Sequence, residues 1–211
     1  MRWRLAMSGV TLVCVCSIVV AAQERSSTAG AVGRVQPFER LAGPRIEVPE
    51  GPDGVAGLLD FCPDRTETCR NYWAYTIDFV RNYTIPLRDK ELLILRTAWL
   101  SRGDYVWGRH RVMGLDAGLT GAEIQRITQG PGASGWSGFD GVLLRAADEM
   151  HTSRFISDDT WNALAERYSQ DQLVEVVLII GNYTQLTMFQ NTLGVPLPPD
   201  VPGLPEATAT R

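Results

Sequence analysis

Apolar residues recur at intervals of three and four along most of this chain, from about residue 66 to residue 193. This spacing places them on one face of an α-helix, so it predicts helices and not strands. The one ambiguous run is residues 173–180, which is rich in β-branched side chains and could form a strand. A single strand would have no partner, and the helical pattern continues through Phe189. The sequence therefore predicts an all-α fold.

Helix-capping and helix-breaking residues divide this pattern into segments. Pro86 suits the position just ahead of a helix, Gly118 suits a helix stop, and Thr120 with Glu123 has the spacing of a capping box. Residues 92–100 are apolar almost all round the helix, so they are expected to be buried in the core or between subunits. The predicted helices cover residues 66–83, 87–101, 104–117, 120–129, 139–150, 158–168 and 171–193.

The two ends of the chain are expected to lie outside the helical domain. Residues 1–22 combine a basic start, 18 uncharged residues and a Val-Ala-Ala cleavage pattern, which predicts a signal peptide. A retained membrane anchor is the alternative, at the lower limit of length. Residues 23–50 are expected to form a flexible linker, residues 51–195 the domain, and residues 196–211 a loosely ordered proline-rich tail. Once the signal is cleaved, the protein is expected in the periplasm or secreted, away from the membrane.

The chain has four cysteines, of which Cys14 and Cys16 lie within the predicted signal peptide. The remaining pair, Cys62 and Cys69, is expected to form a disulfide in an oxidising compartment. Such a bond would close an eight-residue loop. The lower entropy of the unfolded chain would then stabilise the fold by about 2.5 kcal/mol. A redox-active pair is the alternative, although the spacing is not that of a CxxC motif.

Composition and residue counts exclude several classes of function. The chain is 45% hydrophobic and 21% charged with a formal net charge of −4, which suits a soluble globular domain and argues against a nucleic-acid partner. Its only lysine, Lys90, lies at what is expected to be an exposed helix start, so Schiff-base chemistry is not predicted. The two histidines, His110 and His151, are too few for a His-rich metal site, and no nucleotide-binding motif is present. Neither a metal nor a cofactor is therefore predicted.

Glu91 and His110 are the candidate catalytic pair. His110 has Trp107 one turn before it and Met113 one turn after it, so its ring is expected on an apolar face. Glu91 shares a helical stripe with Ile94 and other apolar residues. Burial raises the pKa of a carboxyl group and lowers that of an imidazole, which brings both towards neutrality. Such a pair could relay a proton. The alternatives are a hydrogen-bonded core histidine and an acid that favours the first turn of a helix.

Three stretches of sequence carry a family resemblance: residues 86–100 (PLRDKELLILRTAWL), residues 104–110 (DYVWGRH) and residues 117–120 (AGLT). They resemble the carboxymuconolactone decarboxylase family, which includes the alkylhydroperoxidase D-like proteins. The resemblance extends over about residues 58–195. It implies a helical bundle that assembles into trimers or hexamers, which would also explain a helix that is apolar on all sides.

The resemblance implies two kinds of chemistry. In the peroxidase branch of the family, a Glu, a CxxC pair and a His form a proton relay around a reactive thiol. Glu91 and His110 match the Glu and the His, but Gly103 and Val106 stand at the cysteine positions. In the decarboxylase branch, an anionic lactone loses carbon dioxide without a cofactor, and a general acid protonates the resulting carbanion-like carbon. That branch needs no thiol.

Three functions follow as hypotheses. The first is a decarboxylase-like lyase acting on a small organic acid or lactone. In this enzyme His110 would donate the proton, and Glu91 would orient the His110 side chain. In that mechanism Arg96 or Arg109 would hold the substrate carboxylate, and Trp107 would form a pocket wall. The second is a peroxiredoxin-type oxidoreductase that uses the two remaining cysteines as an unusual redox pair. The third is a non-catalytic oligomer that binds a small molecule.

Overall fold

The computed structural model describes residues 40–49, 58–62 and 66–205. The predicted signal peptide, residues 1–22, lies outside the described residues. So do residues 23–39 of the predicted linker and residues 206–211 of the predicted tail.

The described residues form helices and no strands, which confirms the predicted fold class. Each predicted helical segment is present with slightly different ends, and the capping box of Thr120 and Glu123 is formed. Within the described ranges, no helix is long and apolar enough to cross a bilayer. In chain order the elements are the 3₁₀ helix η1 (Leu58–Phe61) and the α-helices α1 (Glu67–Arg81), α2 (Leu87–Leu100), α3 (Asp104–Asp116), α4 (Gly121–Ile127), α5 (Gly138–Ser153), α6 (Asp158–Ala165) and α7 (Gln170–Leu193).

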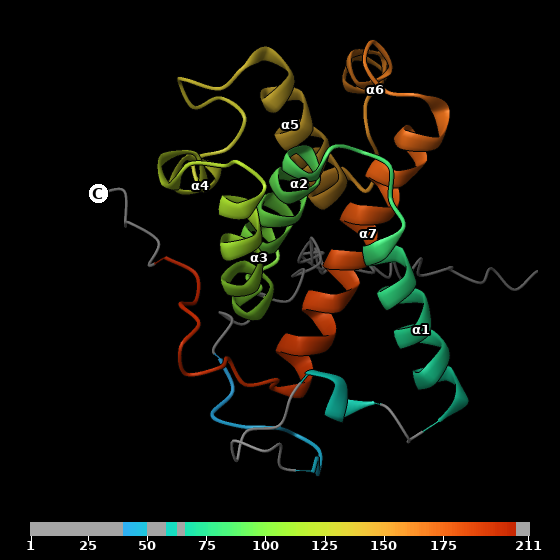
Figure 1. The fold of residues 1–211 in the computed structure, drawn as a ribbon, viewed down its shortest axis with the longest axis vertical. Helices are drawn as coiled ribbons and strands as arrows, with labels where there is room; N and C mark the ends of the chain where they lie inside the picture. Colours follow the sequence, from blue (N-terminus) through green and yellow to red (C-terminus); the bar gives the residue numbers. More distant parts are fainter. Residues whose placement is uncertain (1–39, 50–57, 63–65, 206–211) are drawn as a thin grey trace, which may run out of the picture. The chain divides into compact units, whose positions relative to one another are not determined.

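Helix α2 is the centre of the bundle. It packs against α3, α5 and α7, which surround it (Figure 1). Because neighbours cover it on all sides, every residue from Asp89 to Ala98 is buried, the polar ones included. The all-round apolar pattern of this helix is thus explained by a place in the core of one chain, without a second subunit.

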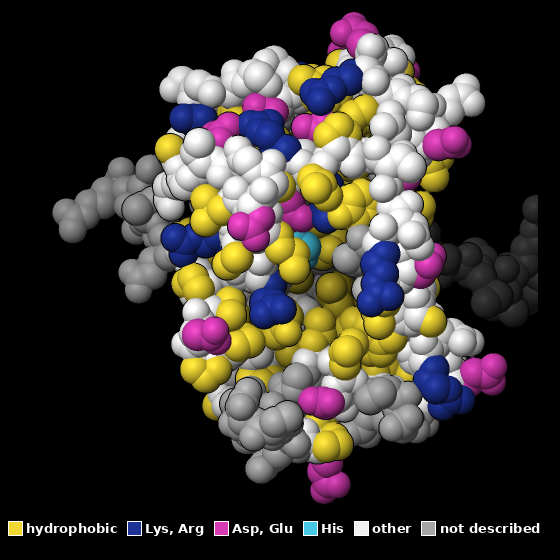
Figure 2. Space-filling model, in the orientation of Figure 1, with side chains coloured by type: hydrophobic (Ala, Val, Ile, Leu, Met, Phe, Trp, Pro, Cys, Tyr) yellow, Lys and Arg dark blue, Asp and Glu magenta, His cyan; other side chains and the backbone are white. Residues whose placement is uncertain are grey.

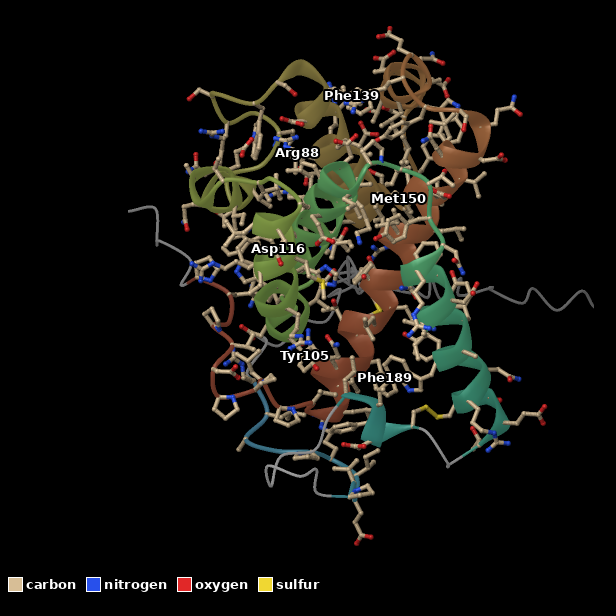
Figure 3. All side chains as sticks on the ribbon, viewed as in Figure 1. Arg88, Tyr105, Asp116, Phe139, Met150 and Phe189 are labelled. Atoms are coloured by element: carbon tan, nitrogen blue, oxygen red, sulfur yellow. A yellow bond between two sulfur atoms is a disulfide. The ribbon has the colours of Figure 1, made fainter. Side chains whose placement is uncertain are left out.

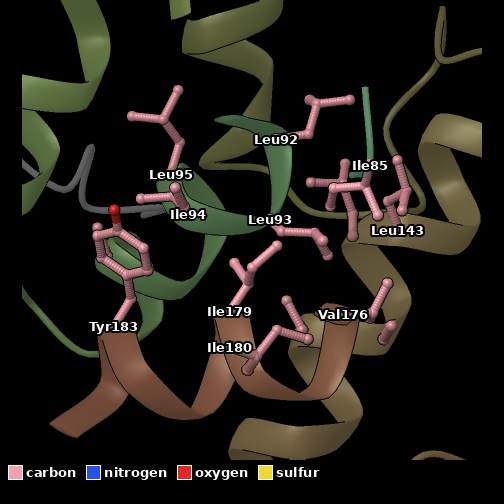
Figure 4. Close-up of a cluster of buried hydrophobic side chains, with 14 of the residues drawn as sticks. Ile85, Leu92, Leu93, Ile94, Leu95, Leu143, Val176, Ile179, Ile180 and Tyr183 are labelled. Atoms are coloured by element: carbon pink, nitrogen blue, oxygen red, sulfur yellow. The ribbon is translucent and has the colours of Figure 1, made fainter. Parts of the chain in front are cut away.

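Side chains of α2, α5 and α7 interlock in the core (Figure 4). Leu93 of α2, Leu143 of α5 and Ile179 of α7 are each completely buried, with 0% of their surface exposed. Full burial of such a side chain contributes about 1.5–3 kcal/mol. This contact between three helices therefore supplies much of the stability of the bundle and holds α2 rigidly in place.

The described part of the proline-rich tail, residues 196–205, contacts α3. The backbone N–H of Leu204 donates to Asp104 Oδ1 at 2.8 Å. A Cβ atom at Gly108 would lie 2.6 Å from the carbonyl oxygen of Pro202, so only glycine lets the tail approach α3 this closely. The prolines do exclude helix here, as predicted, but they do not prevent docking.

Cys62 and Cys69 form a disulfide, as predicted, with their Cα atoms 5.3 Å apart. The bond ties the residue that follows η1 to the first turn of α1. Replacing both cysteines by Ser is expected to lower the free energy of unfolding by about 2.5 kcal/mol, because the unfolded chain regains the entropy of the closed loop. Urea denaturation measures this loss. In the presence of a reductant, wild type and variant should become equally stable, and a difference that persists would contradict the entropic explanation.

Candidate active site

Glu91 and His110 meet where α2 packs against α3. His110 Nδ1 lies 2.7 Å from Glu91 Oε2, and the side chains of His110 and Glu91 are 10% and 2% exposed. Tyr183 of α7 packs edge-on against the imidazole, with the ring centroids 4.9 Å apart. The structure therefore brings together the two residues that the sequence paired, and three helices hold them.

Lys90 completes this buried cluster, although the sequence did not predict its part in it. Lys90 Nζ lies 3.0 Å from Glu91 Oε1, and the lysine side chain is 8% exposed. Lys90 also donates a hydrogen bond to Tyr83 Oη and lies 4.1 Å from the centre of the Tyr83 ring. The expectation of an exposed lysine was wrong because the segment between α1 and α2 places Tyr83 against the first turn of α2.

The charges of the cluster reverse the pKa shift expected for Glu91. Burial is the largest single influence and would raise the pKa of Glu91, but the hydrogen bond and charge of His110, together with those of Lys90, outweigh it. The net pKa lies below the ordinary value, so Glu91 is ionised at neutral pH and does not approach neutrality as expected. Because Glu91 is ionised, its Oε2 accepts a hydrogen bond from His110 Nδ1–H. The proton that can be exchanged is therefore the one on Nε2.

Burial and the nearby Glu91 charge raise the pKa of Tyr183 above its ordinary value. The phenol of Tyr183 therefore keeps its proton throughout the physiological range. It adds no negative charge beside His110, and its ring serves to fix the orientation of the imidazole.

Arg96 makes structural contacts, and its predicted role in holding a substrate carboxylate stays a prediction. Its Nε and Nη2 atoms donate to both carboxylate oxygens of Asp148 at 2.6 and 3.0 Å, and Nη1 donates to the carbonyl oxygen of Ile127 at 2.7 Å. Five positions separate Arg96 from Glu91, so the two side chains leave α2 on different sides. The guanidinium joins α2 to α5 and to the end of α4, away from the α3 side that carries His110.

The other two predicted binding residues, Trp107 and Arg109, precede His110 on α3. Arg109 is exposed to solvent. Trp107 is 2% exposed and packs against Trp99, with the ring centroids 6.0 Å apart. Trp107 is thus a core residue in this structure, and the roles in substrate binding stay predictions.

The positions at which the resemblance implies cysteines are closely packed. A Cβ atom at Gly103 would lie 2.7 Å from Thr187 Oγ1, and Val106 is 2% exposed. A cysteine at position 103 would therefore require Thr187 to move. In the part of the chain that the structure describes, no group of three or more His, Cys, Asp or Glu residues could hold a metal ion.

The sequence matches no family model and no curated protein. Two solved structures are similar to this one. The first is a protein of unknown function from Agrobacterium tumefaciens, described as a candidate antioxidant defence protein AhpD; it aligns with a TM-score of 0.59 and 15% identity over 66% of this chain and 96% of that chain. The second is an uncharacterised peroxidase-related protein from Ralstonia eutropha, described as an alkylhydroperoxidase AhpD core; it aligns with a TM-score of 0.57 and 12% identity over 64% of this chain and 73% of that chain.

At these identities the similarity concerns the fold and not the reaction. The helical bundle that holds Glu91 and His110 has the alkylhydroperoxidase D-like fold.

Proposed function

We propose that this protein is an exported, cofactor-free enzyme that transfers a proton to or from a carbon atom of a small organic acid or lactone. The observation that carries the proposal is the buried cluster of Lys90, Glu91 and His110. Burying charged groups costs free energy even when they are paired, and coupled titratable groups in low-dielectric surroundings are typical of functional sites. The uncharged run within residues 1–22 supports export.

The chemistry of the cluster suits a decarboxylase-like lyase. When the bond between the substrate and its carboxyl group breaks, carbon dioxide leaves and the electron pair stays on the carbon, delocalised into a neighbouring carbonyl. His110 donates its Nε2 proton to that carbon and recovers a proton from water. Glu91 accepts a hydrogen bond from Nδ1–H and so orients the imidazole, while Lys90 pairs with the other carboxylate oxygen of Glu91. General acid catalysis of this kind is worth about 10²–10⁴ in rate.

A peroxidase-related function is the second candidate, because one structural neighbour is described as peroxidase-related and the other as a candidate antioxidant defence protein. A thiol peroxidase needs a thiolate near the relay. Gly103 and Val106 offer none there, and Cys62 is bonded to Cys69. Peroxide consumption that disappears in Cys62→Ser would favour this candidate, whereas a disulfide that peroxide leaves untouched would exclude it.

Hydrogen exchange at carbon tests the proposal directly. The full chain is incubated in D₂O with a panel of small lactones and unsaturated acids, and the products are followed by NMR. We expect deuterium to enter at a carbon next to a carbonyl, with release of carbon dioxide where the substrate is an acid. Binding of these compounds without exchange or release would contradict the proposal and support a non-catalytic binding protein.

We also propose that the protein forms homo-oligomers, trimers or hexamers by the family resemblance. The outer face of α7 supports this, because Val174, Leu178 and Met188 are 54%, 40% and 56% exposed. Gly181 and Gln185 continue the same face, so the stripe is uncharged along its whole length. Contiguous exposed apolar patches are typical of protein interfaces.

Replacing Leu178 by Glu is expected to convert the oligomer to monomers, because each copy would bury a charge in the interface. Sedimentation velocity measures the change in mass. Leu59→Glu is the matched control, since Leu59 is 50% exposed on η1 and lies outside the stripe. An unchanged mass for Leu178→Glu, or a monomeric wild type, would show that this face is not an interface.

A further inference from the structure

A cavity of about 210 Å³ lies where the end of α5 meets α6 and α7. Met150, which lines it from α5, is labelled in Figure 3. An apolar cavity of about 150 Å³ can hold a molecule of benzene, so this one has room for an aromatic ring with a short side chain. Five of its six lining residues are apolar, and together they are Met150, Arg154, Phe155, Ile156, Trp161 and Val177.

The cavity is separate from the candidate active site. Val177 lines it from α7, whereas Tyr183, six positions further along α7, contacts His110. Six positions turn a helix by about 240°, so the two side chains leave α7 on different sides. Figure 2 shows another apolar hollow, between α3 and α1, and no described residue of those two helices lines the present cavity. A ligand of this cavity would therefore not be the substrate of His110.

The segment that joins α5 to α6 holds a large aromatic side chain in contact with water. Phe155 is 66% exposed, although burial of such a side chain is favourable. The segment is fixed just after it, because the Glu149 carboxylate accepts hydrogen bonds from the backbone N–H and the hydroxyl of Ser157 at 2.8 and 2.9 Å. Trp161, the other aromatic residue of the cavity, is 38% exposed. Exposed apolar groups gathered around a cavity are typical of a binding surface.

Arg154 is the charged residue of the cavity wall. It ends α5 with a φ of 60°, in the left-handed conformation that glycine usually takes at this position. Its Nη1 donates to the carbonyl oxygen of His151 at 2.7 Å, which orients the guanidinium. Among the described residues it forms no ion pair. Its other N–H groups are therefore available to an anion.

We infer that this cavity binds an aromatic carboxylate, with the ring among the apolar side chains and the carboxylate on the guanidinium of Arg154. Aromatic rings pack favourably against one another, as a ligand ring could against Phe155 and Trp161. Arginine binds carboxylates through parallel, charge-assisted hydrogen bonds. No acidic residue lines the cavity to repel the ligand. The inference is independent of the proposed function, because neither Glu91 nor His110 takes part in it.

Three ligands separate the contributions of ring and charge. Phenylacetate and 2-phenylacetamide share a shape and differ in charge, whereas acetate has the charge without the ring. The full chain is titrated with each, and the indole N–H resonance of Trp161, assigned with Trp161→Phe, is followed by NMR. Phenylacetate is expected to shift it in a saturable way, with a Kd about tenfold below that of the amide. Acetate should not saturate over the same range.

Three results of this titration would overturn the inference. The first is no saturable shift with phenylacetate, as would follow if a second copy of the chain covers the cavity. The second is an amide that binds as tightly as the acid, and the third is acetate that binds as well as phenylacetate.

Arg154→Gly tests the charge without straining the backbone, because glycine readily adopts a positive φ. The Kd of phenylacetate is expected to rise about tenfold. The Kd of the amide should stay unchanged, which also shows that the cavity is intact. Arg102→Gly is the matched control, since Arg102 is an exposed arginine with a φ of 56° that does not line the cavity. An unchanged Kd of phenylacetate in Arg154→Gly, or the same loss in Arg102→Gly, would overturn the inference.

Phe155→Ala tests the position of the ring. Because Phe155 is exposed, the Tm should stay near that of wild type, while the Kd of phenylacetate and that of the amide should both rise about fivefold. Unchanged Kd values for both ligands would show that the ring does not occupy this cavity.

Discussion

Replacing His110 by Gln is expected to lower kcat for proton transfer by about 10²–10⁴ and to leave the fold intact. The amide of Gln can still donate to Glu91 Oε2, which His110 Nδ1 approaches to 2.7 Å. The amide cannot take up or release a proton near neutral pH. The variant therefore keeps the hydrogen bond to Glu91 but loses proton transfer. The measurement is the rate of deuterium incorporation in D₂O, with circular dichroism and the Tm as the test of folding.

The chain contains its own control for this experiment. His151, the other histidine, is half-buried at the end of α5 and has no contact with the cluster that holds Glu91. The variant His151→Gln should therefore keep the wild-type rate. Turnover that survives in His110→Gln would end the proposed mechanism, even if the protein binds its substrate.

Glu91 acts through His110 and is a positioning residue. Its variant is therefore tested by a measurement that loss of a purely structural contact would not change. In Glu91→Gln, the imidazole loses its carboxylate partner, and the pH at which kcat changes is expected to shift along with the rate.

The pH dependence of stability gives a second measurement for Glu91. Because the pKa of Glu91 is lowered in the folded state, its ionisation stabilises the fold above the ordinary glutamate pKa, and this contribution is lost as the pH falls through the folded-state pKa. The acid sensitivity of wild type should thus be weaker in Glu91→Gln.

Replacing Arg96 by Met is expected to lower the free energy of unfolding by about 3 kcal/mol or more. The variant leaves the Asp148 carboxylate without its bidentate partner and removes one of the two donors to the Ile127 carbonyl, which still accepts from Gly130 N–H. Asp148 is 26% exposed and can be partly rehydrated, which places the loss near the lower end of the range for a broken buried pair. Urea denaturation measures it.

Two further variants separate the ion pair from general effects of losing an arginine. Arg145→Met removes an exposed arginine from α5 and should change stability by less than about 0.5 kcal/mol. The double variant Arg96→Met with Asp148→Leu removes both charges, so it should recover part of the loss. If Arg96→Met were as stable as wild type but inactive, Arg96 would act on substrate after all.

Local sequence signals predicted the helices well because each signal acts within a few residues. Pro86, the Thr120 capping box and the spacing of apolar residues depend on the chain immediately around them. The same reasoning placed Glu91 and His110 on apolar faces, and the packing of α2 against α3 then brings them together. Periodicity alone does not establish burial: Ile77 of α1 has the spacing of a buried residue but is 37% exposed.

Interactions between distant parts of the chain could not be predicted in this way. Lys90 was expected to be exposed, because no local pattern shows that Tyr83 would cover it. From the sequence, Arg96 was predicted to hold a substrate carboxylate. Only the packing of α2 on α5 brings Asp148 to it, across 52 positions of the chain.

By itself, then, the amino-acid sequence determined the helical class, the approximate helix ends and the apolar faces that carry Glu91 and His110, since these follow from periodicity and from contacts within one or two turns. Only the tertiary structure decided which charge each ionisable group faces, and hence that Glu91 is held ionised and Arg96 is paired with Asp148. The physical reason is that the energy of a buried charge depends on the partners and the exclusion of water around it, and helices far apart in the chain supply both.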